Sequence, residues 1–204
     1  MRSLFFAVLF LALSCDGSSG GAGNLAACGP FAACGGSLVE TWEITGYCSD
    51  VTSATTGSCT LTMETSNFHL SGTFTFSNDG SYTSAGTVSG TLGLNYAPGC
   101  FAGTTMSCAR ISSTTSSSDA GVSLTCTSGS AGDCQCTENI ANVPSAEQGT
   151  YTTSGTSVTM IKAGSTQTPT QADYCVQGDT LRLRQTSSTA AAVNGSSILV
   201  LAKR

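Results

Sequence analysis

The sequence predicts an all-β, antiparallel domain that folds as a barrel or, alternatively, as a β-sandwich. Apolar and polar residues alternate with a period of two in many short segments, and turn residues separate these segments. Nothing after the first fifteen residues has the spacing of an amphipathic helix. We therefore expect about eight to ten short strands, connected up and down in an antiparallel order and stabilised by disulfides.

The first fifteen residues predict an export signal. Arg2 precedes an apolar run of about ten residues, which is too short to cross a bilayer. The run ends in Leu11-Ala12-Leu13-Ser14-Cys15, which resembles the bacterial lipobox. The resemblance implies that residues 1–14 are a lipoprotein signal peptide and that Cys15 carries acyl chains of the palmitate type. The alternative is an ordinary signal peptide that is cut nearby, with Cys15 in a disulfide.

The rest of the chain divides into a tether and a folded domain. Residues 15–27 are mostly Gly, Ser, Ala and Asn without periodicity, which is typical of a flexible tether. Residues 28–204 are then the barrel domain. Its first part, from Cys28 to Gly36, is expected to form a small disulfide-pinned cap before the first strand.

Eleven cysteines are present, and ten remain if Cys15 carries lipid. An even number of cysteines indicates structural disulfides and an oxidising compartment, so we expect a bacterial periplasm or cell surface. The candidates are Cys28, Cys34, Cys48, Cys59, Cys100, Cys108, Cys126, Cys134, Cys136 and Cys175.

Two expectations concern particular pairs. Cys108 and Cys126 lie at matching distances from the middle of a Ser/Thr-rich loop, so an antiparallel hairpin would place them opposite each other. Cys134 and Cys136 point to the same side of a strand and are expected to reach different partners. Their single-residue spacing is not that of a zinc site, and we predict neither a metal nor a cofactor.

The elements follow in order along the chain. Trp42 and Ile44 give the apolar face of the first strand. A second face starts at Leu61 and runs to Phe76, with Gly72 permitting a bend or bulge. The turn Ser77-Asn78-Asp79-Gly80 then predicts a hairpin. The remaining predicted strands lie around Val88–Tyr96, Met106–Ile111, Val122–Cys126, Tyr151–Thr153, Val158–Ile161, Tyr174–Val176, Leu181–Arg184 and Ser197–Ala202.

Three segments resemble the bacterial lipocalin-like domains: Val39–Ile44, Gly72–Tyr82 and Gly149–Val158. In that family a tryptophan near the N-terminus closes one end of an up-and-down barrel, and the resemblance assigns this role to Trp42. Segments around Cys34, Cys136 and Cys175 resemble a cysteine-rich group of secreted lipoproteins. Glu40 departs from the family pattern, which has a glycine there.

Composition excludes some function classes. Charged residues make up 9% of the chain, the net charge is −5, and no basic cluster is present, so we expect no nucleic-acid partner. The only expected membrane contact is the lipid on Cys15.

The sequence contains no catalytic motif of a known hydrolase or nucleotide enzyme, and we predict a protein that is not an enzyme. His69, the single histidine, is expected at the surface of its strand. Asp50, Asp79 and Asp179 adjoin turn residues, where aspartate usually caps its own backbone.

Aromatic side chains supply the candidate binding residues: Trp42, Phe68, Phe74, Phe76, Tyr82 and Tyr96. They either line a cavity for an apolar ligand or fill a solid core, because an eight-stranded barrel is just wide enough for its own side chains. Arg182 and Arg184 lie either on a solvated strand face or inside the barrel, where they would meet an anionic headgroup.

We therefore expect a non-catalytic, membrane-anchored lipoprotein of the cell envelope, with a small hydrophobic molecule as the candidate ligand. The alternative is an interaction module, such as an adhesin or a protease inhibitor, that acts through the Ser/Thr-rich loops Ser112–Ala120 and Gln167–Ala172. An interior cavity of ligand size distinguishes the two, because only the first function requires one.

Overall fold

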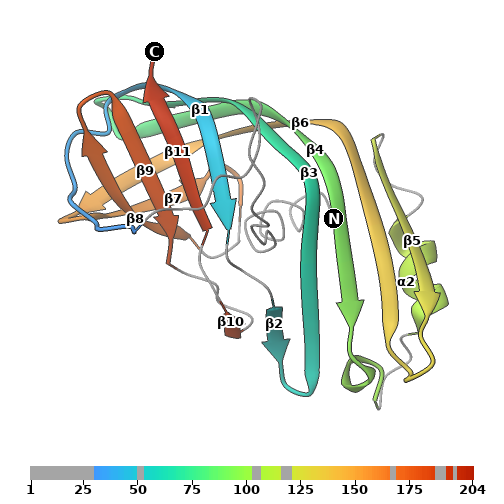
Figure 1. Cartoon of the computed structure of the whole chain (residues 1–204). Coiled ribbons are helices and arrows are strands. Elements are labelled where there is room, and N and C mark those ends of the chain that lie inside the picture. Colours follow the sequence, from blue (N-terminus) through green and yellow to red (C-terminus); the bar gives the residue numbers. More distant parts are fainter. Residues whose placement is uncertain are drawn as a thin grey trace.

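The computed structural model describes residues 30–49, 53–102, 107–115, 121–165, 169–186, 192–194 and 197–204. Antiparallel strands dominate and form a single sheet (Figure 1). The strands are β1 (Glu40–Ser49), β2 (Ser53–Thr56), β3 (Cys59–Phe76), β4 (Ser81–Tyr96), β5 (Val122–Ser128), β6 (Cys134–Ser154), β7 (Ser157–Lys162), β8 (Thr170–Gln177), β9 (Thr180–Gln185), β10 (Ala192–Asn194) and β11 (Ser197–Lys203). Two helical segments accompany them, η1 (Pro98–Cys100) and α2 (Cys108–Thr115).

Eight of these strands follow one another around a ring, in the order β1-β11-β9-β8-β7-β6-β4-β3. The ring closes where residues 40–43 of β1 pair with residues 73–76 of β3. Apart from the pair of β1 with β11, strands that are neighbours in the ring are also consecutive along the chain, once β2, β5 and β10 are set aside. The predicted all-β, antiparallel, barrel-like fold is therefore confirmed. The expectation of eight to ten short strands is wrong, because the described residues form eleven strands and β3, β4 and β6 have 18, 16 and 21 residues.

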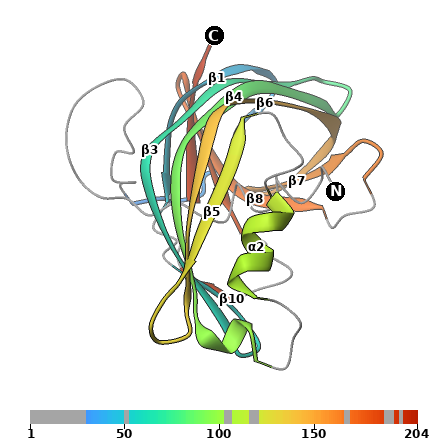
Figure 2. The ribbon, with the colours of Figure 1, turned by 90° about the vertical axis from the view of Figure 1, so that its right-hand side faces the viewer.

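Three long strands leave the ring together. β3, β4 and β6 continue beyond it and form a second region, which we call the side sheet (residues 53–66, 90–96, 122–128 and 134–140). β2 flanks β3 there, and β5 flanks β6. Helix α2 packs beside β5 (Figure 2). Figure 1 shows the side sheet extending away from the ring.

The three strands change register at the same level, where the ring meets the side sheet. β3 shifts between Ser66 and His69, and β4 shifts between Val88 and Gly90. Asn67 in β3 and Asn142 in β6 have φ of 51° and 48°, a left-handed conformation that asparagine tolerates better than most residues. Bulges bend and twist a strand, so these positions redirect the sheet out of the ring.

Inside the ring, two glycines allow β3 and β4 to approach closely. Gly72 has a φ of 140° and lies directly opposite Gly86. A Cβ on Gly72 would lie 2.2 Å from the carbonyl oxygen of Ala85, and one on Gly86 would lie 2.2 Å from that of Ser71. Both positions therefore require glycine.

The two regions have separate hydrophobic cores. The ring core consists of Leu38, Trp42, Tyr47, Phe68, Phe76, Tyr82, Val88, Ile140, Val158, Ala172, Tyr174, Leu181, Leu183, Leu199 and Leu201. The side-sheet core consists of Met63, Leu92, Leu94, Ile111, Leu124, Cys134 and Cys136. The change of register at Gly90 divides β4, so that Val88 belongs to the first core and Leu92 to the second.

Helix α2 corrects two expectations. The chain was predicted to have no helix after the signal and a strand from Met106 to Ile111, but Cys108–Thr115 is α-helical. Ser107 caps this helix, because its hydroxyl accepts a hydrogen bond from the Arg110 backbone N–H at 3.3 Å. Ile111 is buried in the side-sheet core, so tertiary packing stabilises a segment whose composition does not favour a helix.

Four disulfides connect described residues: Cys34–Cys175, Cys59–Cys100, Cys108–Cys134 and Cys126–Cys136. Cys48 is disulfide-bonded as well, to a partner outside the described residues.

The expected Cys108–Cys126 pair is wrong. β5 pairs with β6 rather than with the segment that contains Cys108, and Cys126 lies directly opposite Cys136. Cys108, in the first turn of α2, bonds Cys134 instead. Cys134 and Cys136 thus reach different partners, as predicted. The sulfur atoms of Cys126, Cys134 and Cys136 lie within 4.8 Å of one another, but disulfides leave them no thiolate for a metal.

The predicted signal peptide, the tether, Cys15 and Cys28 lie outside the described residues. Within the described ranges, no helix has both the length and the apolar character needed to cross a membrane.

Candidate ligand-binding site inside the ring

The ring is filled at the end where β1 and β3 pair. Residues 34–35 pair in parallel with β8 through backbone hydrogen bonds, and the Cys34–Cys175 disulfide attaches them to the same strand. Leu38 then enters the ring core, and the indole Nε1 of Trp42 donates a hydrogen bond to its carbonyl oxygen at 2.8 Å. Trp42 is only 1% exposed. Trp42 is therefore buried, as predicted, and a disulfide at Cys34 attaches the cap, as predicted.

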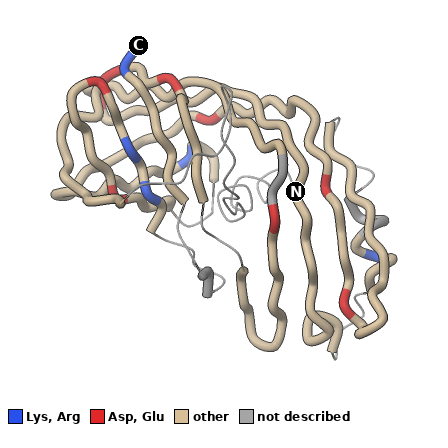
Figure 3. Tube along the Cα trace, in the orientation of Figure 1, with Lys and Arg blue, Asp and Glu red and all other residues tan. Residues whose placement is uncertain are grey.

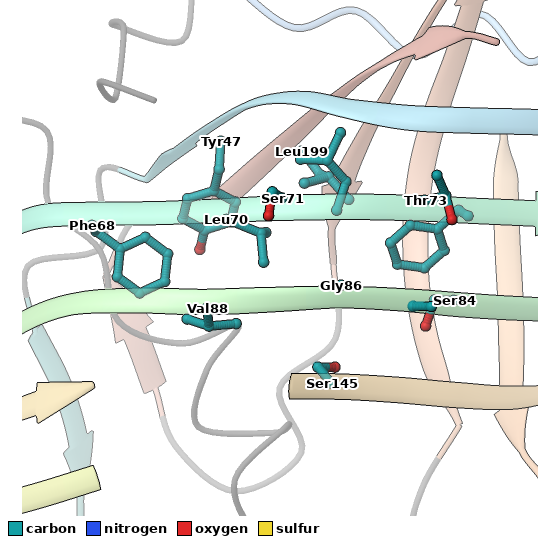
Figure 4. A pocket seen from close by; sticks show the side chains of 13 residues that line it. Tyr47, Phe68, Leu70, Ser71, Thr73, Ser84, Gly86, Val88, Ser145 and Leu199 are labelled. Carbon is teal, nitrogen blue, oxygen red and sulfur yellow. The ribbon is translucent and has the colours of Figure 1, made fainter. Parts of the chain in front are cut away.

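A pocket begins where the pairing of β1 with β3 ends. Beyond Glu43, the described residues of β1 form no ladder with β3. The pocket there holds about 510 Å³ of space between the atoms, part of which is open to solvent, and apolar side chains dominate its wall (Figure 4). The lining residues are Ile44, Tyr47, Phe68, Leu70, Ser71, Thr73, Phe74, Ser84, Ala85, Gly86, Val88, Ser145 and Leu199. We call this the apolar pocket.

A second pocket adjoins the first and holds about 600 Å³ of space between the atoms, again partly open to solvent. Its wall is also mostly apolar, and we call it the polar pocket because the charged side chain of Glu147 lines it. The two share Tyr47, Phe74 and Leu199, so they are neighbouring parts of one interior. The polar pocket is also lined by Tyr82, Glu147, Met160, Thr170, Ala172, Leu183, Gln185 and Ser197. Binding sites for small molecules typically combine apolar walls with a few polar groups.

The interior contains an ion pair. A Cβ on Gly149 would lie 2.8 Å from the ring of Tyr82, so this face of β6 points into the ring. Glu147, two residues earlier, shares the face because side chains alternate along a strand. Its Oε1 lies 2.6 Å from Nζ of Lys162. The Glu147 side chain is 15% exposed and the Lys162 side chain 35%, so the carboxylate lies inside and the amine reaches toward solvent. Charged residues are sparse along the chain trace (Figure 3).

This pair affects the neighbouring tyrosine. Burial, together with the negative charge of Glu147, raises the pKa of Tyr82 to about 12. The phenol therefore keeps its proton at neutral pH and can donate a hydrogen bond into the polar pocket. Neither Glu147 nor Lys162 was singled out from the sequence. The only available signal was the alternation around Tyr151, which places Glu147 on the apolar face of its strand.

The six predicted aromatic residues divide into three groups. Phe68, Phe74 and Tyr82 line the pockets. Trp42 and Phe76 are 1% exposed and fill the ring core without lining either pocket. Tyr96 packs against the side-sheet core, outside the ring. The predicted aromatic residues within the ring are thus divided between its packed end and the walls of the two pockets.

The hypothesis that Arg182 and Arg184 lie inside the barrel is wrong. Leu181 and Leu183 take the inward positions of β9, so the arginines face outward. The guanidinium groups of Arg182 and Arg184 lie 5.5 and 4.7 Å from the ring centroid of Phe31. Arg184 also forms an ion pair with Asp173 at 2.7 Å.

The other candidates lie at the surface or beyond the described ranges. His69 is exposed, as expected. Asp79 caps its turn by accepting hydrogen bonds from the backbone N–H and the hydroxyl of Ser81, which lower the pKa of its carboxyl group. Asp179 lies in the turn between β8 and β9, and Asp50 is outside the described residues.

The two loops of the alternative hypothesis are described only in part. Residues 112–115 belong to α2 and 169–172 reach into β8, whereas 116–120 and 166–168 lie outside the described residues.

Comparisons with protein-family models, with curated proteins and with solved structures give no match to this chain.

Proposed function

We propose that the ring binds a small hydrophobic molecule and that the protein acts as a non-catalytic carrier or receptor of such a molecule. The observation that carries the proposal is the apolar pocket at the point where β1 separates from β3. Burying apolar ligand surface there is favourable by roughly 25 cal/mol per Å². Among the described residues, the side chains that line the apolar pocket are mostly apolar, which suits binding of an apolar ligand.

A packed end and a hollow middle support this function together. Trp42 and Phe76 hold one end of the ring in a fixed shape, so the pocket walls are organised before a ligand arrives. A preorganised site loses less entropy on binding than a mobile one. The resemblance to lipocalin-like domains agrees with the proposal, since up-and-down barrels of this size can hold one small ligand.

The proposal is tested with N-phenyl-1-naphthylamine, a neutral apolar dye whose fluorescence rises when it leaves water. We expect saturable binding to the wild-type protein. Leu70→Trp should fill the apolar pocket and weaken binding by at least about tenfold. His69→Trp is the matched control, because it adds the same ring at the exposed neighbouring position and should leave binding unchanged. Equal binding by both variants would contradict the assignment of the pocket.

We further propose that the folded domain is held at a cell-envelope membrane by acyl chains on Cys15. The proposal is supported by the lipobox-like sequence and by the number of disulfides, which suits an oxidising compartment. A hydrophobic ligand of a protein at a membrane surface need not cross bulk water to reach its site. The anchor is tested separately from the pocket, as described in the Discussion.

A further inference from the structure

From the interior ion pair we infer that the ligand is amphipathic: an apolar body with a hydrogen-bond-donating head, an amine or a hydroxyl, which Glu147 recognises. This inference rests on the proposed function and adds the class of ligand. It depends on how charge is distributed between the two pockets.

Both pockets have mostly apolar walls, but only the polar pocket is lined by a charged side chain. Ile44, Phe68, Leu70 and Val88 line the apolar pocket only. Glu147, Thr170, Gln185 and Ser197 line the polar pocket only. Phe74 and Leu199 belong to both, so a single elongated molecule can extend from one pocket into the other. A wholly apolar ligand would leave the Glu147 carboxylate unused, whereas an amphipathic ligand matches both the apolar walls and this carboxylate.

Glu147 has a free hydrogen-bond acceptor. Its Oε1 accepts from Nζ of Lys162, and no bond to Oε2 is formed among the described residues. A donor on the ligand can form a second, charge-assisted hydrogen bond to this carboxylate. A head that carries N–H or O–H supplies this donor.

The charge of the head follows from the same geometry. An ammonium group forms a charge-assisted hydrogen bond with the carboxylate, roughly twice as strong as a neutral one. A hydroxyl forms the neutral bond. A carboxylate head would face Glu147 as a like charge, because Glu147 lines the polar pocket whereas its partner Lys162 lines neither pocket. The expected order of affinity is therefore amine, then alcohol, then carboxylate.

The test displaces N-phenyl-1-naphthylamine with decylamine, 1-decanol and decanoate, which share one chain length. We expect decylamine to bind about tenfold more tightly than decanoate at neutral pH. In Glu147→Gln the two affinities should become similar. Glu43→Gln, on the outer face of β1, is the matched control and should keep the wild-type order. If decanoate binds wild type as tightly as decylamine, or if Glu147→Gln keeps the preference, the inference is overturned.

A second variant tests the inference independently if Glu147→Gln does not fold. Lys162→Gln removes the neighbouring cation and leaves the carboxylate charge less compensated, so the preference for decylamine should increase. An unchanged or smaller preference in a folded Lys162→Gln protein also overturns the inference. If the dye and all three chains fail to bind wild type, the proposed function itself fails. If all three bind equally well, only the amine-recognising head site fails.

Discussion

The indole of Trp42 donates a hydrogen bond to the backbone of Leu38, four residues earlier, at 2.8 Å. This bond joins the segment that crosses the ring end to the first strand of the ring. Both residues are buried, at 1% and 2% exposure, so the polar atoms of the contact are satisfied without water.

Trp42→Ala should destabilise the protein by about 3 to 5 kcal/mol, because truncating a packed aromatic side chain leaves a cavity. Trp42→Phe keeps most of the apolar volume and loses the hydrogen bond, so it should cost less. Thermal unfolding followed by circular dichroism measures both. Equal melting of Trp42→Ala and wild type would show that the ring end does not depend on this side chain.

The disulfides should contribute unequally to stability. In the chain-entropy model, the Cys34–Cys175 bond, with a sequence separation of 141, constrains the unfolded chain more than Cys126–Cys136, with a separation of 10. Replacing both cysteines by alanine should cost about 5 kcal/mol for the first pair and about 3 kcal/mol for the second. Denaturant unfolding of the two double variants gives the comparison. The prediction fails if Cys126/Cys136 is the more costly pair.

Glu138 should make stability depend on pH. It is 8% exposed on the inner face of the side sheet, and burial raises the pKa of its carboxyl group above the ordinary value of 4.5. At pH values between the ordinary and the raised pKa, the Glu138 carboxyl group therefore keeps its proton in the folded state and has lost it in the unfolded state. The contribution of this proton to stability is fully present below the ordinary pKa and is lost as the pH rises through the raised pKa.

Glu138→Gln removes this titration and should flatten the fall in melting temperature above pH 4.5. The measurement is a series of thermal melts across mildly acidic to neutral pH. Glu64→Gln, an exposed carboxyl on β3, should leave the wild-type profile intact. A Glu138→Gln profile that follows wild type would assign the pH dependence to other groups.

Cys15→Ala should abolish lipid incorporation and shift the protein from the detergent phase to the aqueous phase.

Nine cysteines already take part in disulfides, including Cys48, which leaves only Cys15 and Cys28. We predict that peptide mapping pairs Cys48 with Cys28. A Cys15–Cys48 peptide, or unchanged partitioning of Cys15→Ala, would exclude the lipid anchor.

Local patterns along the chain were sufficient to predict most strands from the sequence. The alternation of Phe74 and Phe76 with threonines and the turn Ser77–Gly80 together predict the hairpin of β3 and β4, because side-chain alternation and turn chemistry both act over a few residues. The fold class and the burial of Trp42 follow from the same kind of signal. The even number of cysteines after Cys15 indicated disulfides in the same way.

Longer-range features depended on the tertiary structure. Cys108 was paired wrongly because the partner of β5 is β6 and not the preceding segment, and loop residues carry no signal of that choice. Helix α2 forms where Ile111 and the Cys108–Cys134 bond attach it to the side sheet, so its stability comes from contacts outside its own sequence.

The sequence by itself therefore determined the strand-forming segments, the hairpin turns and the presence of structural disulfides, because each depends on neighbouring residues or on composition. Only the tertiary structure decided where the ring is filled and where it is hollow. Glu147 and Lys162 are 15 residues apart in sequence and meet because β6 pairs with β7 around the ring. The pocket exists because β1 leaves β3 after Glu43, and the closure of a sheet on itself is a property of all its strands together.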